Sequence, residues 1–237
     1  MAEYILRCRN LVKNYGAFNA LKGIDIDIEK GKIVGLLGPN GSGKTTFIKT
    51  VAGVLTCDGG VLQIDGKTPG YETKSIVSYL PERTYFNSWM TVRDCIEYFE
   101  DFYTDFDRQR AEAMIYDLNL SLDSKLQHLS KGSKEKVQLV LVMSRKAKLY
   151  LLDEPIGGVD PAARDYILET IISKFDKEAT IIISTHLIAD IENHLDRFIL
   201  INDGKIILNG EVAKVKEDMG MSLDEYFREV FKCSRNF

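Results

Sequence analysis

Two patterns of apolar residues predict two kinds of strand in this chain. Ile24, Ile26 and Ile28 alternate with acidic residues, which is typical of a half-exposed strand in an antiparallel sheet, and residues 4–10 fit the same sheet. Continuous apolar runs predict strands buried on both faces, as in a parallel sheet. These runs fall at residues 32–37, 149–152, 180–183 and 198–201.

Helical patterns separate the buried runs, so we expect an α/β fold with a mainly parallel core sheet behind an N-terminal antiparallel β-subdomain. Asn202-Asp203-Gly204 predicts a turn that pairs the last buried strand with residues 205–208. The expected organisation is a single domain over 1–237. Its parts are a core of 1–87 and 148–210, an inserted α-helical subdomain at about 88–147 and a C-terminal helical tail at 211–237.

Two capping boxes mark predicted helix starts. Thr91 with Asp94 begins the inserted helical segment, and Ser222 with Glu225 begins an amphipathic helix near the C-terminus. Aromatic residues concentrate at the start of the helical segment, between positions 79 and 106. They either pack a small helical core or, for some of them, form a docking surface for a partner.

Composition narrows the function classes. The net charge of −4 and the pI near 5.5 argue against a nucleic-acid partner, which would need a basic face. The four cysteines form no CxxC pair, so we interpret them as reduced packing residues rather than as zinc ligands or disulfides. The sequence contains no secretory signal pattern and no apolar run of membrane-spanning length, so a membrane role would require a partner.

The strongest chemical signal is a phosphate-binding loop between a buried strand and a helix. Residues 38–45 read G-x-x-x-x-G-K-[ST], in which glycines let backbone N–H groups surround a polyphosphate. We expect Lys44 to reach the terminal phosphates, Thr45 to bind magnesium, and Thr46 to cap the helix or contact the α phosphate. The predicted ATP-binding residues here are Gly38, Asn40, Gly41, Ser42, Gly43, Lys44, Thr45 and Thr46. The alternative is a glycine-rich turn that only joins strand to helix.

A second part of the site follows the strand at 149–152. Asp153 is placed to hold magnesium from its other side, and Glu154 to polarise the water that attacks the terminal phosphate. An Asp-Glu pair alone would be a solvated turn, but the apolar run before it and the phosphate loop favour the functional interpretation.

In this motif order the sequence resembles the ATP-binding subunits of ABC transporters over nearly its whole length. Leu129-Ser130-Lys131-Gly132-Ser133 is similar to the family's LSGGQ signature, whose Ser130 and Gly132 would face the ATP of a second ATP-binding subunit in a head-to-tail dimer. Lys131 and Ser133 depart from that pattern. The departure removes an amide and adds a cation.

The resemblance assigns further roles, each with a structural alternative. Tyr15 resembles the aromatic that stacks on adenine, although it could be a core tyrosine. His186 resembles the switch histidine at the γ phosphate, although a lone histidine is usually structural. Asp160 resembles the D-loop residue at the dimer interface, although it could lie in a simple turn. Glu82 stands at the position of the family's Q-loop glutamine and would contact the metal with an added negative charge.

The resemblance implies an ATPase subunit that powers a separate transmembrane permease from the cytoplasmic face of the membrane. Its motifs are most similar to bacterial exporters of antimicrobial peptides, drugs and amphipathic toxins, including the phenol-soluble-modulin type. Two alternatives differ in class. One is a regulatory module that binds ATP without turnover, against which intact Glu154 and His186 argue, and the other is an ABC-type nucleic-acid or ribosome factor.

Overall fold

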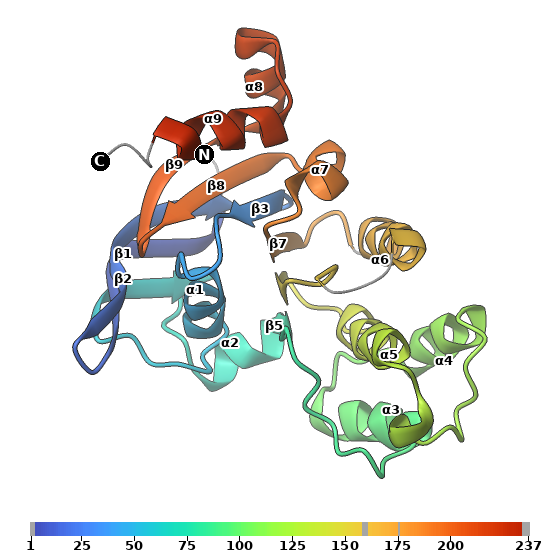
Figure 1. The fold of residues 1–237 in the computed structure, drawn as a ribbon. Helices are drawn as coiled ribbons and strands as arrows, with labels where there is room; N and C mark the ends of the chain where they lie inside the picture. Colours follow the sequence, from blue (N-terminus) through green and yellow to red (C-terminus); the bar gives the residue numbers. More distant parts are fainter. Residues whose placement is uncertain (1–2, 158–160, 175, 234–237) are drawn as a thin grey trace.

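The N-terminal sheet is antiparallel and longer than predicted. In the computed structural model, which describes residues 3–157, 161–174 and 176–233, it contains β1 (Tyr4–Tyr15), β2 (Phe18–Glu29) and β4 (Gly59–Ile64) in the order β2-β1-β4 (Figure 1). The first two strands continue to a tight hairpin in which Tyr15 pairs with Phe18. Gly16 makes the turn possible because its φ of 58° lies in the left-handed region. The predicted strands were therefore right in kind and too short.

The central sheet confirms the α/β prediction. Its strands are β3 (Ile33–Leu37), β5 (Val77–Leu80), β6 (Leu149–Asp153), β7 (Thr180–Thr185), β8 (Arg197–Asn202) and β9 (Lys205–Glu211). They lie in the order β5-β6-β7-β3-β8-β9, and every neighbouring pair is parallel except β8 with β9. The predicted hairpin is confirmed, with Asp203 and Gly204 at positive φ between β8 and β9.

Helices surround the two sheets, and Figure 1 shows α3, α4 and α5 as a lobe apart from them. The α-helices are α1 (Lys44–Val51), α2 (Tyr71–Ile76), α3 (Val92–Phe102), α4 (Arg108–Asp117), α5 (Lys131–Met143), α6 (Pro161–Lys174), α7 (Ile188–Ile191), α8 (Val212–Met219) and α9 (Leu223–Cys233). Short 3-10 turns lie at Leu126–His128 and Glu192–His194. Both predicted capping boxes form, at Thr91 with Asp94 and at Ser222 with Glu225.

The central sheet buries both of its faces, which explains its continuous apolar strands. One face packs on α1 and on the inner side of the N-terminal sheet, through residues such as Val34, Leu36, Leu151, Phe47 and Ile48. The opposite face packs on α5, α6 and the C-terminal helices, through residues such as Leu152, Ile183, Leu200, Val140 and Ile171. Successive residues of a strand alternate between these two layers.

The aromatic residues of the helical segment divide between core and surface. Phe99 is buried, and Phe86, Tyr103 and Phe106 pack beside it in the same cluster. The exposed members are Tyr85, Trp89, Tyr98 and Phe102. The packing interpretation therefore holds for the first subset, and a docking role for the exposed subset stays a prediction.

A buried guanidinium joins the helical lobe to the central sheet. Arg145, just after α5, is 2% exposed and pairs with Asp105 at 3.0 Å. It also donates to the backbone carbonyls of Val77 at 2.6 Å and Ser75 at 2.8 Å, and it lies 3.8 Å from the ring centroid of Tyr103. Its donors are satisfied by both parts of the molecule, so Arg145 fixes the lobe against β5.

Two further predictions can be compared with the described residues, which do not include the side chain of Cys233. Cys8 and Cys95 are buried as expected, but Cys57 is exposed, so the packing interpretation was wrong for Cys57, which lies in the loop before β4. Within the described ranges, none of the helices is both long enough and apolar enough to cross a membrane. The predicted boundaries of the core, lobe and tail stay a prediction.

Candidate active site

The phosphate loop connects the end of β3 to the start of α1. Gly41 and Gly43 have φ values of 79° and 108°, which place the loop in conformations that other residues adopt poorly. Gly38 has a different constraint, because a Cβ there would lie 2.3 Å from the carbonyl oxygen of Ile201. Gly43 is the N-cap residue of α1, and Thr46 lies inside the helix, so the suggestion that Thr46 caps it was wrong.

Lys44 is held beneath the loop and is 6% exposed. Its ammonium donates to the carbonyls of Gly38 at 2.8 Å and Pro39 at 3.2 Å, and it lies 3.5 Å from a carboxylate oxygen of Glu154. Burial lowers the pKa of Lys44, and the neighbouring Glu154 opposes that shift. A partly desolvated ammonium interacts strongly with an anion, so this position favours a phosphate ligand.

Asp153 ends β6 and is 1% exposed. Its Oδ1 accepts hydrogen bonds from Ser184 at 2.7 Å and from Thr45 at 3.1 Å, whereas its buried Oδ2 has no hydrogen-bond partner among the described residues. Burial is the main cause of its raised pKa, which the two hydroxyl bonds oppose. A bound cation would remove this desolvation cost and use the free oxygen.

These oxygen donors fit magnesium better than zinc. No cluster of three or more His, Cys, Asp or Glu side chains suited to a metal occurs in the described part of the chain. Magnesium needs only one or two protein oxygens because it keeps several waters and also binds substrate phosphates. Thr45 and Asp153 supply such a pair at the edge of the phosphate loop.

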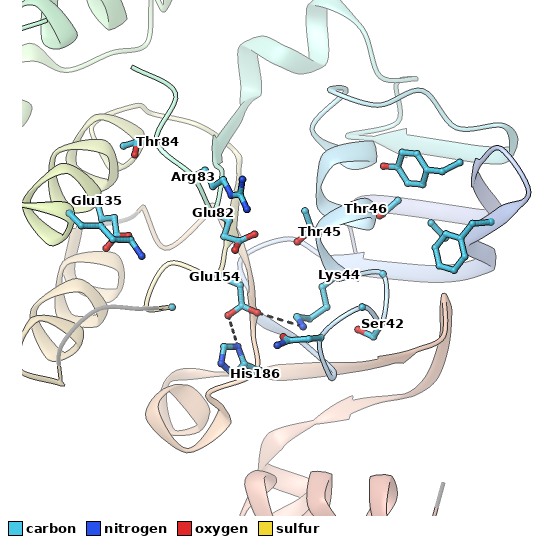
Figure 2. Close-up of a pocket in the computed structure, with 18 residues that line it drawn as sticks. Ser42, Lys44, Thr45, Thr46, Glu82, Arg83, Thr84, Glu135, Glu154 and His186 are labelled. Atoms are coloured by element: carbon cyan, nitrogen blue, oxygen red, sulfur yellow. Dashed lines mark hydrogen bonds and ion pairs between the residues drawn. The ribbon is translucent and has the colours of Figure 1, made fainter. Parts of the chain in front are cut away.

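Glu154 lies between the loop lysine and the histidine that follows β7 (Figure 2). One carboxylate oxygen is 3.5 Å from Lys44, and the other is 3.0 Å from Nδ1 of His186. The backbone of Glu154 is left-handed, with φ at 51°, and its N–H donates to Ser184 O at 3.0 Å. These contacts fix the direction of the carboxylate, as a general base requires.

The predicted catalytic residues and most of the predicted phosphate-binding residues share one cavity of about 1030 Å³. From the core, Asn40, Gly41, Ser42, Gly43, Lys44, Thr45, Thr46, Glu154 and His186 line it. On the opposite side, Figure 2 shows Glu82, Arg83, Thr84 and Glu135. Glu82 therefore lies at the cavity, as predicted. Its metal contact stays a prediction.

Two aromatic side chains line the cavity at the N-terminal hairpin. Tyr15 was predicted there and is 49% exposed, while Phe18, its partner across the turn, is 61% exposed. Tyr15 is therefore not a core residue, and its exposed ring presents a face on which a base could stack. Its contact with adenine stays a prediction.

The remaining predicted residues lie differently. Ser130 caps α5 and accepts from the Ser133 N–H at 3.1 Å, and neither Ser130 nor Gly132 lines the cavity of its own chain. Lys131 of the same motif does line it. Asp160 lies outside the described residues.

Sequence reasoning missed several members of the site, four of which have polar or aromatic side chains of interest. They are Phe18, Arg83, Ser184 and Glu135. Ser184 could have been found from the register of the sheet, because it pairs with Asp153 in the parallel β6–β7 ladder. No sequence pattern indicated that Arg83 or Glu135 would line the cavity, since each is a charged residue within a polar stretch.

Comparisons with known proteins agree with the geometry. A family model described as ABC transporter matches residues 21–157. An uncharacterized ABC transporter ATP-binding protein of Synechocystis is 32% identical over 221 residues, which are 90% of this chain, and the chain spans 61% of that relative. The SkfA peptide export ATP-binding protein SkfE of Bacillus subtilis is 30% identical, with 90% of this chain and 92% of the relative covered. A solved ATP-binding subunit of an ABC transporter superposes with a TM-score of 0.86 at 29% identity, covering 96% of this chain and 99% of its own.

Proposed function

Because the chain belongs to the ABC transporter family of ATP-binding proteins, we propose that it binds ATP with magnesium in the main cavity and hydrolyses it. The observation that carries the proposal is Glu154, held between Lys44 and His186 beside the unpaired Oδ2 of Asp153. This arrangement supplies a cation for phosphate, an oxygen for metal and a positioned base within one cavity.

Each side chain has a distinct role in the proposed reaction. Lys44 exchanges its carbonyl partners for oxygens of the β and γ phosphates, and the loop N–H groups hold the same oxygens. Thr45 and Asp153 hold magnesium, which would neutralise charge on the phosphate oxygens. Glu154 takes a proton from the attacking water, and His186 keeps the Glu154 carboxylate aimed at that water.

We further propose that two ATP-binding subunits pair head to tail around two ATP molecules. Ser130 and Gly132 support this, since they do not line the cavity of their own chain and lie at the N-terminus of α5, whose N–H groups attract an anion. A Cβ at Gly132 would meet nothing within 4 Å, so packing within the chain does not require glycine there. Close approach of a second chain at this position would require glycine.

The proposed partner of this pair is a separate transmembrane permease. The exposed rings of Tyr85, Trp89, Tyr98 and Phe102 form a surface on the helical lobe that suits docking, since aromatic side chains are enriched at protein interfaces. Export of peptides, toxins or drugs is the proposed direction, by analogy with the peptide export protein of B. subtilis. In this arrangement the chain would act at the cytoplasmic face of the membrane.

Magnesium-dependent ATP hydrolysis across a range of protein concentrations tests the proposal. We expect turnover to rise more steeply than linearly with protein and to fall by at least about 100-fold in Glu154→Gln, with ATP binding retained. Glu217→Gln, an exposed position on α8, is the matched control and should behave as wild type.

Two outcomes would contradict the proposal. Full turnover in Glu154→Gln would remove Glu154 as the base. ATP binding without turnover in the wild-type chain, at every protein concentration and with its permease present, would instead support the regulatory module that binds ATP without hydrolysis.

A further inference from the structure

Tyr79 shares a sheet face with the proposed metal site. In the parallel pair of β5 and β6, Tyr79 is opposite Leu151, and Asp153 lies two residues beyond Leu151 on the same face. Ser184, which bonds Asp153, is opposite it on β7 and faces the same layer. That layer packs on α1, which begins with Lys44 and Thr45, and Tyr79 belongs to it.

The Tyr79 hydroxyl has an unmet hydrogen-bond requirement. Its oxygen is buried and has no partner among the described residues, and the same is true of Asp153 Oδ2. Burial, together with the negative charges of Asp153 and Glu82, raises the pKa of Tyr79 well above its ordinary value. The hydroxyl therefore keeps its proton and is a hydrogen-bond donor close to two carboxylates.

Another buried tyrosine shows that this fold can satisfy such a hydroxyl. Tyr150, on β6, donates to the backbone carbonyl of Arg145 at 2.5 Å. Buried polar groups are almost always paired, so an unpaired donor and an unpaired acceptor on one sheet face leave room for a further group that completes both. A water molecule is the smallest group that accepts from a phenol and donates to a carboxylate.

We propose that Tyr79 is a positioning residue for magnesium, whose hydroxyl donates a hydrogen bond to a water of the metal's shell beside Asp153. This inference rests on the proposed function. In the complex with magnesium and ATP, this water would be held by Tyr79 and by Asp153 Oδ2. Magnesium retains most of its waters, so a fixed water improves metal binding without adding a charge.

Tyr79→Phe tests the inference because it removes only the hydroxyl. Two quantities would be measured: the unfolding temperature of the free protein, with ATP in EDTA and with ATP plus magnesium, and the affinity of the ATP complex for manganese by electron paramagnetic resonance. We expect the free variant to unfold at or above the wild-type temperature, since an unpaired buried donor is gone. The shift caused by ATP in EDTA should be unchanged, the added shift from magnesium smaller, and manganese binding weaker on the order of tenfold.

Tyr150→Phe is the matched control. It also removes one buried hydroxyl, but a paired one, so it should lower the unfolding temperature and leave the magnesium shift and the manganese affinity unchanged. A wild-type magnesium shift and manganese affinity in Tyr79→Phe would overturn the inference while the proposed function stands. Absence of any magnesium effect in the wild-type protein would overturn both.

Discussion

The two walls of the active-site cavity are built in opposite ways. On the core wall, Lys44 and Asp153 are 6% and 1% exposed, and each is held by at least two polar contacts. On the lobe wall, the Lys131 side chain is 77% exposed, its ion pair with Glu135 is long at 3.6 Å, and Glu135 Oε2 is buried with no partner among the described residues. The side chains of the first wall are fixed within one chain and leave Asp153 Oδ2 free for a ligand, whereas the second wall is exposed and weakly held.

The difference follows from where each wall lies in the fold. Core residues stand at the ends of strands whose register is fixed by neighbours on both sides, so their side chains have little freedom. The lobe residues come from the loop after β5 and from the first two turns of α5, where neighbouring strands are absent. A preorganised wall suits chemistry, and an open wall suits a partner that closes over it.

Loss of Arg145, which fixes the helical lobe against the central sheet, should have the largest effect. Arg145→Met leaves Asp105 and two backbone carbonyls without their buried donor, so we expect a loss of about 3–5 kcal/mol in the free energy of unfolding. Chemical denaturation would measure it. Arg93→Met, which breaks the exposed pair with Asp123, is the control and should cost less than about 1 kcal/mol. Equal losses of unfolding free energy in the two variants would show that Arg145 does not fix the lobe against the central sheet.

The core wall should dominate ATP binding. Lys44→Ala removes the buried ammonium, and we expect ATP affinity to fall on the order of 100-fold, since hydrogen bonds to charged groups contribute about 1.5–3 kcal/mol. Calorimetric titration would measure it, with Lys49→Ala on the same helix as the control. A loss of less than about threefold would argue against a phosphate ligand at Lys44.

The lobe wall should contribute less to a single chain. Lys131→Ala removes an exposed cation, so we expect the ATP affinity of the isolated chain to fall by no more than about fivefold. Lys134→Ala, one turn further along α5, is the control, and the same titration applies. A fall as large as that of Lys44→Ala would remove the contrast between the walls.

Asp65 and its two lysine partners, none of which lines the cavity, should show the smallest effect. Asp65 bonds Lys148 and Lys30, and these contacts lower its pKa. Its contribution to stability is present above the unfolded pKa of about 3.9 and is lost as the pH falls through the lower folded pKa. Asp65→Asn should cost less than about 1 kcal/mol at neutral pH and flatten this acid dependence, as urea unfolding at several pH values would show. An unchanged acid dependence would contradict this.

The sequence could predict the core wall better than the lobe wall. The phosphate loop and Asp153-Glu154 are local motifs at the ends of buried strands, and local pattern determines their place. Arg145 and Tyr79 depend on which strands become neighbours, which no short motif encodes, because β5 precedes β6 by more than sixty residues and still pairs with it. The hairpin at Gly16 was missed for a different reason, since residues 11–15 and 18–23 lack a clean alternation.

The left-handed backbone of Glu154 has a consequence for any attempt to stabilise this protein. Glycine or asparagine adopts φ near 51° with less strain than glutamate does, so Glu154→Gly should relieve a local cost of about 1 kcal/mol. The same change removes the proposed base. Selection for thermal stability alone would therefore favour substitutions of Glu154 that abolish the proposed activity. Screens for stabilised variants need to keep Glu154 unchanged.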